Sequence, residues 1–293
     1  MVRPSMLLAL GALAATAVAC APASETTTQT SSAAPSASGA AAGACAKDGL
    51  ALKTPGKLTI GTDKPAYEPW FNGDDPSNGK GFESAVAYAV AGQMGFAEGD
   101  VTWATVKFDS AFAPGAKQFD FDVNQVSVTP DRAKVVDFSK GYYTVKQAVV
   151  ALDGSKVAAA TGLADLKDAK IGVQVGTTSL QAVKDVIQPS AELNVYNEQI
   201  DAVNALKNKQ VDAVVVDLPT AFYVTAAQVE NSKIVGQFGT ASGVPEVFGA
   251  VFEKGSPLVS CVNEAIDKLT ASGELAKIET EWLGSAAGAP ELK

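Results

Sequence analysis

Hydrophobic residues recur along this chain with two alternating spacings. Short runs in which apolar residues alternate or stand together are typical of strands, and they occur at 57–62, 101–106, 119–123, 148–152, 170–175, 193–196 and 211–216. Apolar residues three and four positions apart predict helices over about 82–94, 179–187, 200–207 and, with a break at Gly273, 262–282. Repeated strand–helix units predict α/β lobes, and the near-continuous apolar run at 211–216 predicts a buried parallel strand.

The N-terminal region differs in character from the rest of the chain. An apolar stretch at 6–19 has the length of a signal peptide and is too short to span a bilayer comfortably. It ends in small residues directly before Cys20, and the segment after it consists almost entirely of Ala, Ser, Thr, Pro and Gly. We therefore expect a signal peptide at 1–19, then a disordered tether at 20–50 that begins with lipidated Cys20. Plain secretion after cleavage in the same region is the alternative.

Composition narrows the possible functions. The chain of 293 residues has no histidine, which excludes Ser-His and Cys-His nucleophiles and His-ligated metal sites. Its net charge of −9, without a basic run, excludes a typical nucleic-acid interface, because phosphate contacts need clustered Lys and Arg. The three cysteines contain no CxxC pair, so we expect neither a structural zinc site nor a thioredoxin-like centre. No bound metal and no cofactor are expected. If Cys20 carries a lipid, Cys45 and Cys261 remain, and we expect a disulfide between them. Two buried free thiols are the alternative.

Three expected strand-to-helix transitions carry polar groups that suit a charged ligand. Thr129, followed by a proline, is expected to begin a helix with Arg132 in its first turn, and free N–H groups with a guanidinium suit a carboxylate. Thr177 and Thr178 begin a second helix, and Asp217 ends the buried strand, where α/β sheets bind ligands. Together these groups suit a zwitterion, with its carboxylate on Arg132 and its ammonium on Asp217. Surface ion pairing for Arg132 and simple helix capping for the others are the alternatives.

Aromatic side chains follow two of the expected strands. Tyr67 and Trp70 lie in the loop after 57–62, and Phe108 follows 101–106. Aromatic side chains at strand ends can sandwich an apolar or flat part of a ligand. The alternative is that they close the core beneath a loop, and this applies to Trp70 in particular.

With these residues the chain resembles the extracytoplasmic solute-binding proteins of polar amino-acid ABC transporters (solute-binding protein family 3). The resemblance covers about residues 50–285 and is carried by blocks in a specific order, which are Gly61-Thr62-Asp63 with Tyr67 and Pro69, Gly81-Phe82-Glu83, Ser127-Val128-Thr129-Pro130-Asp131-Arg132, Val136-Asp137-Phe138-Ser139 with Tyr142-Tyr143, Gly172-Val173-Gln174-Val175-Gly176-Thr177-Thr178, and Asp212-Ala213-Val214-Val215-Val216-Asp217. The resemblance implies an α/β fold of the type II periplasmic-binding class, a two-lobed Venus flytrap with a mixed sheet flanked by helices in each lobe.

The resemblance also implies a division of the chain between the lobes. Lobe 1 would be discontinuous, made of 51–150 plus 247–285, and lobe 2 would span 151–246. The hinge crossings would lie at about 148–152 and 242–248.

Residue roles follow from the same resemblance. Arg132 would hold a ligand α-carboxylate, assisted by Ser127 and the amide of Thr178, and Asp217 would hold the α-ammonium group. Tyr67 and Phe108 would sandwich the ligand side chain, and Asp63 would contact the polar groups of that side chain. The implied ligand-binding residues are Asp63, Tyr67, Trp70, Phe108, Gln125, Ser127, Arg132, Thr177, Thr178 and Asp217.

The chain departs from the family pattern at the side-chain pocket. Asn124 and Gln125 stand where small hydroxyl residues often occur, and the segment at 113–117 is an unusual insert. The residues expected to hold the two charged main-chain groups of the ligand are therefore better specified than those around its side chain. Asp63 and Glu68 only slightly favour a basic amino acid.

The expected function is the lipid-anchored solute-binding component of an ABC importer. Such a protein captures a polar amino acid by lobe closure at the outer face of the cell membrane and delivers it, as a monomer, to membrane permease subunits. One alternative is an enzyme on the same fold, a dehydratase or lyase, for which Glu68 is the nearest candidate carboxylate. The other alternative is a ligand-sensing domain.

Overall fold

The computed structural model describes residues 45–284 and 288–293. The expected signal peptide, Cys20 and most of the expected tether lie outside these residues. Within the described residues, no helix has both the length and the apolar character needed to cross a bilayer.

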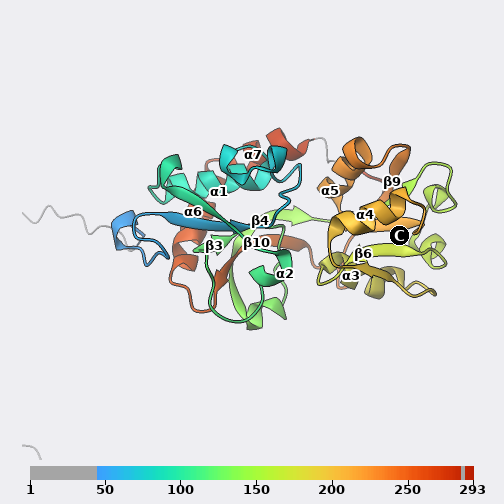
Figure 1. Cartoon of the computed structure of the whole chain (residues 1–293), viewed down its shortest axis with the longest axis horizontal. Helices are drawn as coiled ribbons and strands as arrows, with labels where there is room; N and C mark the ends of the chain where they lie inside the picture. Colours follow the sequence, from blue (N-terminus) through green and yellow to red (C-terminus); the bar gives the residue numbers. More distant parts are fainter. Residues whose placement is uncertain (1–44, 285–287) are drawn as a thin grey trace, which may run out of the picture. The chain divides into compact units, whose positions relative to one another are not determined.

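The described residues form two lobes, each built on a five-stranded sheet (Figure 1). The first sheet consists, in spatial order, of β2 (Val101–Thr105), β1 (Leu58–Thr62), β3 (Phe121–Asp122), β10 (Glu246–Glu253) and β4 (Val136–Val145). Strands β2, β1 and β3 are parallel, whereas β10 runs antiparallel to both β3 and β4. The sheet is therefore mixed, and one of its inner strands comes from near the end of the chain.

The second sheet is also mixed. It consists, in spatial order, of β7 (Asn194–Tyr196), β6 (Ile171–Gln174), β8 (Ala213–Asp217), β5 (Gln147–Leu152) and β9 (Ser232–Phe238). Strand β6 pairs in parallel with β7 and β8, and β5 runs antiparallel to β8 and β9. The apolar run that ends at Asp217 is buried at the centre of this sheet, as the sequence predicted for a buried strand.

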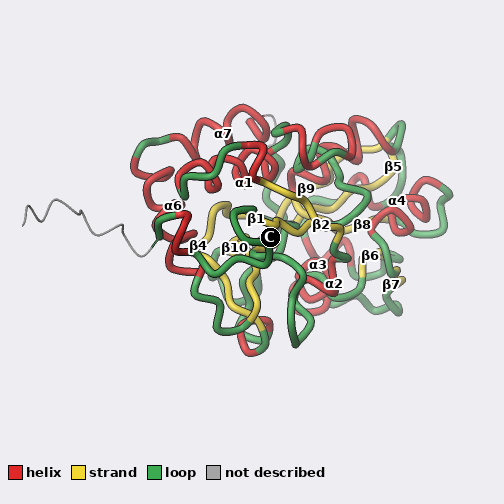
Figure 2. The backbone as a smooth tube through the Cα atoms, turned by 60° about the vertical axis from the view of Figure 1, so that its left-hand side comes forward, coloured by secondary structure: helices red, strands yellow, loops and turns green. Residues whose placement is uncertain are grey.

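Helices cover the sheets of both lobes (Figure 2). In the first lobe, α1 (Phe82–Gln93), α6 (Leu258–Ala271) and α7 (Glu274–Leu283) pack against one another, and the short α2 (Phe108–Ala111) follows β2. In the second lobe, α3 (Thr178–Ala182) and α5 (Leu218–Tyr223) follow the ends of β6 and β8, and α4 (Gln199–Lys207) packs on β6. Helices α3 and α5 each continue into one π-helical turn, at Val183–Ile187 and Val224–Gln228.

The chain crosses between the lobes at two neighbouring places. It passes from β4 to β5 through Lys146 alone, and from β9 to β10 through 239–245. The whole of β5 pairs within the second sheet, so the first crossing precedes the range of 148–152 that the resemblance implied. Residues at the C-terminus also reach the second lobe, where Leu292 is buried and its backbone N–H donates to the carbonyl oxygen of Gln237.

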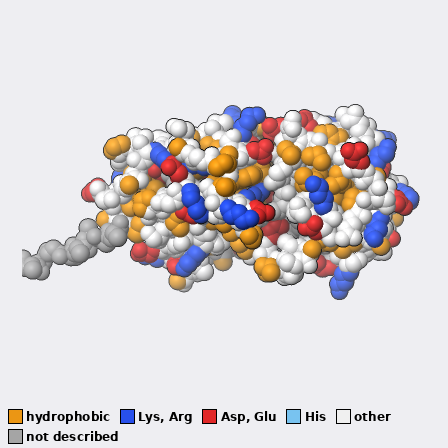
Figure 3. All heavy atoms as spheres, turned by 90° about the horizontal axis from the view of Figure 1, so that it is seen from below, with side chains coloured by type: hydrophobic (Ala, Val, Ile, Leu, Met, Phe, Trp, Pro, Cys, Tyr) orange, Lys and Arg blue, Asp and Glu red, His pale blue; other side chains and the backbone are white. Residues whose placement is uncertain are grey.

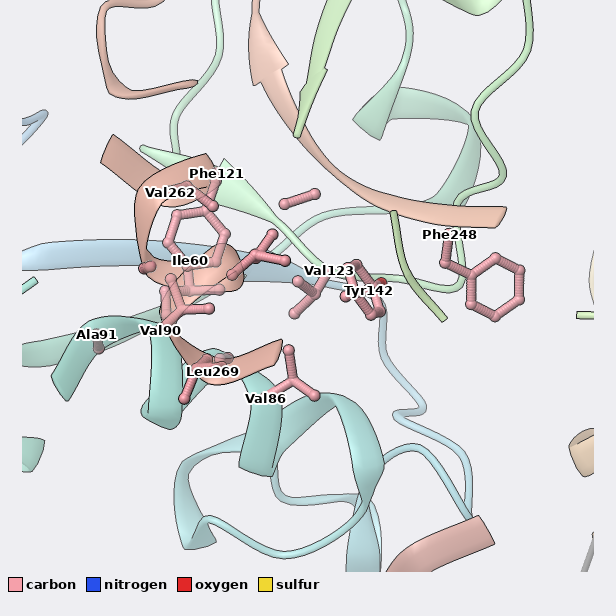
Figure 4. Packing of buried hydrophobic residues seen from close by; sticks show 14 of the residues in the cluster. Ile60, Val86, Val90, Ala91, Phe121, Val123, Tyr142, Phe248, Val262 and Leu269 are labelled. Atoms are coloured by element: carbon pink, nitrogen blue, oxygen red, sulfur yellow. The ribbon is translucent and has the colours of Figure 1, made fainter. Parts of the chain in front are cut away.

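The core of the first lobe fixes the strands whose ends reach the space between the lobes. Val86 and Val90 of α1 face Ile60 of β1 and Phe121 of β3, and α6 adds Val262 (Figure 4). Each of these side chains is at most 2% exposed, and full burial of a residue of this size stabilises the fold by roughly 1.5–3 kcal/mol. The strand ends beyond this core are therefore held firmly.

A disulfide joins Cys45 to Cys261, as the cysteine count predicted. It links the beginning of the described chain to α6 of the first lobe. The fold therefore holds a covalent staple close to the point where the expected tether ends.

Two expected elements are shorter than the sequence indicated. The strand expected at 119–123 is limited to β3, because the carboxylate of Asp120 accepts the backbone N–H groups of Lys53 and Thr59. The helix expected at Thr129 is wrong: only a 3₁₀ turn, Arg132–Lys134, forms before β4 begins. A single short turn has no appreciable macrodipole, so Arg132 contributes its guanidinium and not a helix N-terminus.

Candidate functional site

A cavity of about 60 Å³ lies between the lobes, at the carboxyl ends of β1, β6 and β8. A confined cavity of this kind suits a small solute. Its lining includes most of the expected ligand-binding residues, namely Asp63, Tyr67, Phe108, Gln125, Thr177, Thr178 and Asp217. Elements far apart in the sequence therefore bring these side chains together.

Arg132 is only 8% exposed and is not itself among the residues that line this cavity; its bond to Gly176 places it next to the lining residue Thr177. Its Nη1 donates to the carbonyl oxygen of Ser127 at 2.8 Å, and its Nη2 donates to that of Gly176 at 2.9 Å. The guanidinium carbon lies 4.2 Å from the centroid of the Phe112 ring. Burial lowers the pKa of Arg132 to about 10, although the charges of Glu246 and Asp217 oppose this shift. The group therefore stays cationic at neutral pH, and its protein hydrogen-bond acceptors are neutral carbonyls.

Asp217 brings a half-buried carboxylate to the cavity from the second lobe. Its Oδ1 accepts a hydrogen bond from Nε2 of Gln147 at 2.9 Å, and its side chain makes no capping bond to α5. Burial raises the pKa of Asp217 well above its ordinary value, and the nearby charge of Glu246 adds to this effect. Such a carboxylate suits an ammonium group, which would offset the cost of burying the negative charge.

The turn before α3 brings the two lobes into close contact. Thr177 caps α3, with its Oγ1 accepting the N–H of Leu180 at 3.1 Å, as the sequence indicated. Gly176 has a φ of +74°, and a Cβ there would lie only 2.9 Å from Oδ1 of Asp109 in the first lobe. A side chain at this position would be strained at the positive φ and would displace the carboxylate of Asp109, so glycine suits this approach.

Acidic groups surround the aromatic end of the cavity. Asp63 accepts the backbone N–H groups of Lys64 at 2.6 Å and Phe108 at 3.1 Å, and burial raises its pKa. Burial, followed by the charges of Glu198, Asp63 and other carboxylates, raises the pKa of Tyr67 to about 12. Two carboxylates therefore lie at this end of the cavity, and one of them, Glu198, also pairs with the exposed Lys107 at 3.3 Å. On the face drawn in Figure 3, by contrast, acidic and basic side chains are interspersed over the surface.

Two sequence-based assignments need correction. The ring of Trp70 is fully buried, packs edge-on against Phe248 at 5.5 Å, and donates from Nε1 to Oγ1 of Thr220 at 2.9 Å, so it belongs to the core and does not line the cavity. Ser127 is 1% exposed, and its hydroxyl donates to Oε1 of Glu246 at 2.5 Å. The hydroxyl therefore points to a second buried carboxylate, with Oγ1 of Thr178 at 3.4 Å, and Ser127 is not among the residues that line the cavity.

The sequence analysis missed several residues around the cavity. Glu198 and Thr220 line it, and Gln147 and Glu246 lie against its charged groups. Glu246 begins a strand whose apolar run, 247–252, the sequence analysis did not assign, and a polar residue directly before such a run is the signal that could have pointed to it. Across 45–284 and 288–293, no group of three or more His, Cys, Asp or Glu side chains is placed to hold a metal ion.

Gln125 is held in place from behind the cavity. It has a φ of +50°, and the carboxylate of Glu83 accepts its backbone N–H at 2.8 Å. Glu83 also accepts hydrogen bonds from the side chain of Gln125 and the hydroxyl of Tyr142. Full burial raises the pKa of Glu83 to about 7.

Comparisons with known proteins agree with this geometry. The sequence profile described as "Bacterial extracellular solute-binding proteins, family 3" matches residues 58–285. A probable histidine-binding protein of Campylobacter jejuni is 31% identical over 224 residues, which are 74% of this chain and 80% of the relative. The arginine-binding extracellular protein ArtP of Bacillus subtilis is 28% identical over 77% of this chain and 86% of its own length.

Solved structures show the same architecture. The arginine-, lysine-, histidine-binding protein ArtJ of Geobacillus stearothermophilus matches with a TM-score of 0.65 and 26% identity, over 78% of this chain and 95% of that one. An ancestral arginine-binding protein bound to arginine matches with a TM-score of 0.66 and 31% identity, over 78% and 99%. The fold is that of the type II periplasmic-binding proteins, as the sequence predicted, and these relatives are named as binding proteins and not as enzymes.

Proposed function

The chain belongs to the bacterial extracellular solute-binding proteins of family 3, and we propose that it captures a polar amino acid, preferably one with a cationic side chain, for an ABC importer. The observation that carries this proposal is the pairing of two opposite charges beside one cavity. Arg132 comes from the first lobe and is buried, and Asp217 comes from the second lobe, is half-buried and lines the cavity. An amino-acid zwitterion supplies a carboxylate for the first and an ammonium for the second.

Capture proceeds by lobe closure. The ligand docks on the first lobe through Arg132, Tyr67 and Phe108, and Asp217 and Thr178 of the second lobe then engage it. Contacts made only after closure stabilise the closed form, and this differential binding drives the change. The lobe contacts at Arg132 and Gly176, and from Trp70 to Thr220, belong to that closed form.

The preference for a cationic side chain rests on the acidic end of the cavity. Asp63 and Glu198 line it from opposite lobes, and their charges act on Tyr67, which lines the same end. A guanidinium or ammonium group between them would gain charge-assisted hydrogen bonds. Relatives named for arginine and histidine binding are consistent with this preference.

Location and partners follow from the family and the N-terminal sequence. The protein acts outside the cytoplasm, anchored through lipidated Cys20 at the outer face of the membrane and joined to its binding domain by the tether. It delivers the ligand as a monomer to permease subunits. The amino acid is released unchanged, so the protein is not an enzyme.

A thermal-shift screen against the twenty amino acids tests this function. L-arginine or L-lysine is expected to raise the melting temperature most, because a ligand that binds only the folded protein stabilises it. A shift with none of the twenty would contradict amino-acid capture. Chemical conversion of a bound amino acid would support the alternative of a dehydratase or lyase instead.

A further inference from the structure

The two crossing strands each contribute one buried polar side chain next to the cavity. Gln147 begins β5 and is 0% exposed, and Glu246 begins β10 and is 9% exposed. Nε2 of Gln147 donates to Oε2 of Glu246 at 3.1 Å, so a hydrogen bond joins the crossings. These two residues therefore form a bridge at the hinge, which we call the hinge bridge.

The hinge bridge reaches both charged ends of the site. On one side, Glu246 accepts the hydroxyl of Ser127, whose carbonyl oxygen accepts a hydrogen bond from Arg132. On the other side, Gln147 donates to Oδ1 of Asp217 at 2.9 Å. Gln147 is fixed in turn by Ser179, whose hydroxyl donates to its Oε1 at 2.6 Å. A continuous chain of hydrogen bonds thus runs from Arg132 to Asp217 through the hinge.

We infer that Glu246 and Gln147 are positioning residues that set the charge with which Asp217 meets the ligand ammonium group, so that both residues tune amino-acid affinity and its pH dependence. This inference rests on the proposed function, because it concerns the same site. Neither residue lines the cavity, so each acts through a neighbour. Glu246 places a second negative charge beside Asp217, and Gln147 stabilises the ionised form of Asp217 by hydrogen bonding.

The charges around Asp217 come from several elements. Glu246 on β10 and Glu83 on α1 raise its pKa, whereas Arg132 and the hydrogen bond from Gln147 lower it; Tyr143 on β4 also faces it. A protonated Asp217 cannot form an ion pair with an ammonium group. Affinity for an amino acid is therefore expected to fall as the pH falls through the pKa of Asp217.

Two substitutions separate the effects of Glu246 and Gln147 on the pKa of Asp217, because they are expected to shift this pKa in opposite directions. Glu246→Gln keeps the shape but removes the charge, so the pKa of Asp217 should fall by about one unit or more. Gln147→Met removes the donor, so this pKa should rise. Glu253→Gln is the matched control, because Glu253 ends the same strand β10 and pairs with Lys53.

The first measurement needs no ligand. Carbon-13 NMR of the aspartate carboxyl groups across pH 4–9 reports the titration midpoint of each carboxyl group. The signal of Asp217 is identified because it is missing in Asp217→Asn. We expect a lower midpoint in Glu246→Gln, a higher one in Gln147→Met and no change in Glu253→Gln. Equal midpoints in the wild-type protein and Glu246→Gln would overturn the inference, since the fold alone would then set the charge of Asp217.

The second measurement is calorimetry with L-arginine across the same pH range. Affinity should fall toward acidic pH in the wild-type protein, and the fall should begin at lower pH in Glu246→Gln. Parallel pH profiles would overturn the inference. If L-arginine fails to bind at any pH while the NMR midpoints shift as expected, the proposed cationic ligand is wrong and the charge coupling of the hinge bridge stands.

Discussion

The guanidinium of Arg132 in the first lobe donates a hydrogen bond to the carbonyl oxygen of Gly176 in the second lobe, over 2.9 Å. The cation that is proposed to hold the ligand carboxylate thus also holds the lobes together. Ligand binding and lobe closure therefore share one group, and changes at either residue should affect both.

Replacing Arg132 by alanine should weaken amino-acid binding by about 30-fold or more, because losing one partner of a buried charge pair costs about 2–5 kcal/mol. Calorimetry measures the affinity, and circular dichroism shows whether the fold persists. Lys134→Ala is the control, since Lys134 lies on the same turn but is exposed and pairs with Asp131. Unchanged affinity in Arg132→Ala would contradict the assignment of the carboxylate partner.

Replacing Gly176 by alanine should impair closure. The added Cβ would lie 2.9 Å from Oδ1 of Asp109 while the backbone keeps a positive φ, so the closed form loses more stability than the open one. Gly154→Ala is a matched control, because Gly154 has a φ of +72° and a Cβ added there would meet nothing within 4 Å. Affinity should fall in Gly176→Ala only, whereas both variants lose some thermal stability. Equal affinity in the two would show that this lobe contact is dispensable.

Removing charge at the acidic end of the cavity should change selectivity. Asp63→Asn and Glu198→Gln should each weaken L-arginine binding by about 10-fold or more and leave L-glutamine binding nearly unchanged, because hydrogen bonds to charged groups contribute about 1.5–3 kcal/mol. Competition calorimetry measures the ratio of the affinities for L-arginine and L-glutamine. Glu68→Gln is the control, since Glu68 lies in the same loop region and accepts hydrogen bonds from Asn72 and Gly73 outside the cavity lining. If this affinity ratio is the same in Asp63→Asn as in the wild-type protein, Asp63 is excluded as a selectivity residue.

Glu83 should make the stability of the protein depend on pH. Its pKa is about 7 in the folded protein and 4.5 as an unperturbed group, so the folded state binds the extra proton between these values. Stability should therefore fall as the pH rises from about 4.5 to 7, by roughly 3 kcal/mol in total from this group. Urea unfolding at pH 5 and pH 8 should show a smaller difference in Glu83→Gln than in the wild-type protein. An identical difference would mean that Glu83 stays charged throughout.

Local patterns were sufficient to predict the α/β class, most strand and helix positions, and the disulfide. These features depend on periodicity, on glycine and proline, and on the number of cysteines, all of which are properties of nearby residues or of composition. Gly273, for example, has a φ of +75° and separates α6 from α7 where the helical spacing breaks.

Features that depend on distant pairing could not be predicted. Strand β10 carries an apolar run, 247–252, that the sequence analysis did not assign to a strand, and Glu246 lies directly before this run. The position of Glu246 beside Gln147 and Ser127 depends on the antiparallel pairing of β10 with β4. The sequence left open whether Trp70 lines a site or closes the core beneath a loop, and only the fold decides this, because its ring packs against Phe248 and Tyr143 from later strands. Arg132 and Asp217 were singled out because strand-end polar residues converge in α/β sheets, and their role as partners of a zwitterion stays a prediction. The orientation of the Ser127 hydroxyl, by contrast, depends on Glu246 across the hinge.

Zwitterion capture, the central claim, is tested most directly by calorimetry of the unchanged protein with three related compounds. L-arginine has both charged main-chain groups, agmatine lacks the carboxylate, and N-acetyl-L-arginine lacks the ammonium group. Arg132 and Asp217 predict one L-arginine bound per protein and at least about 30-fold weaker binding of each of the other two. Equal affinity for all three would contradict recognition of the zwitterion by these two charges.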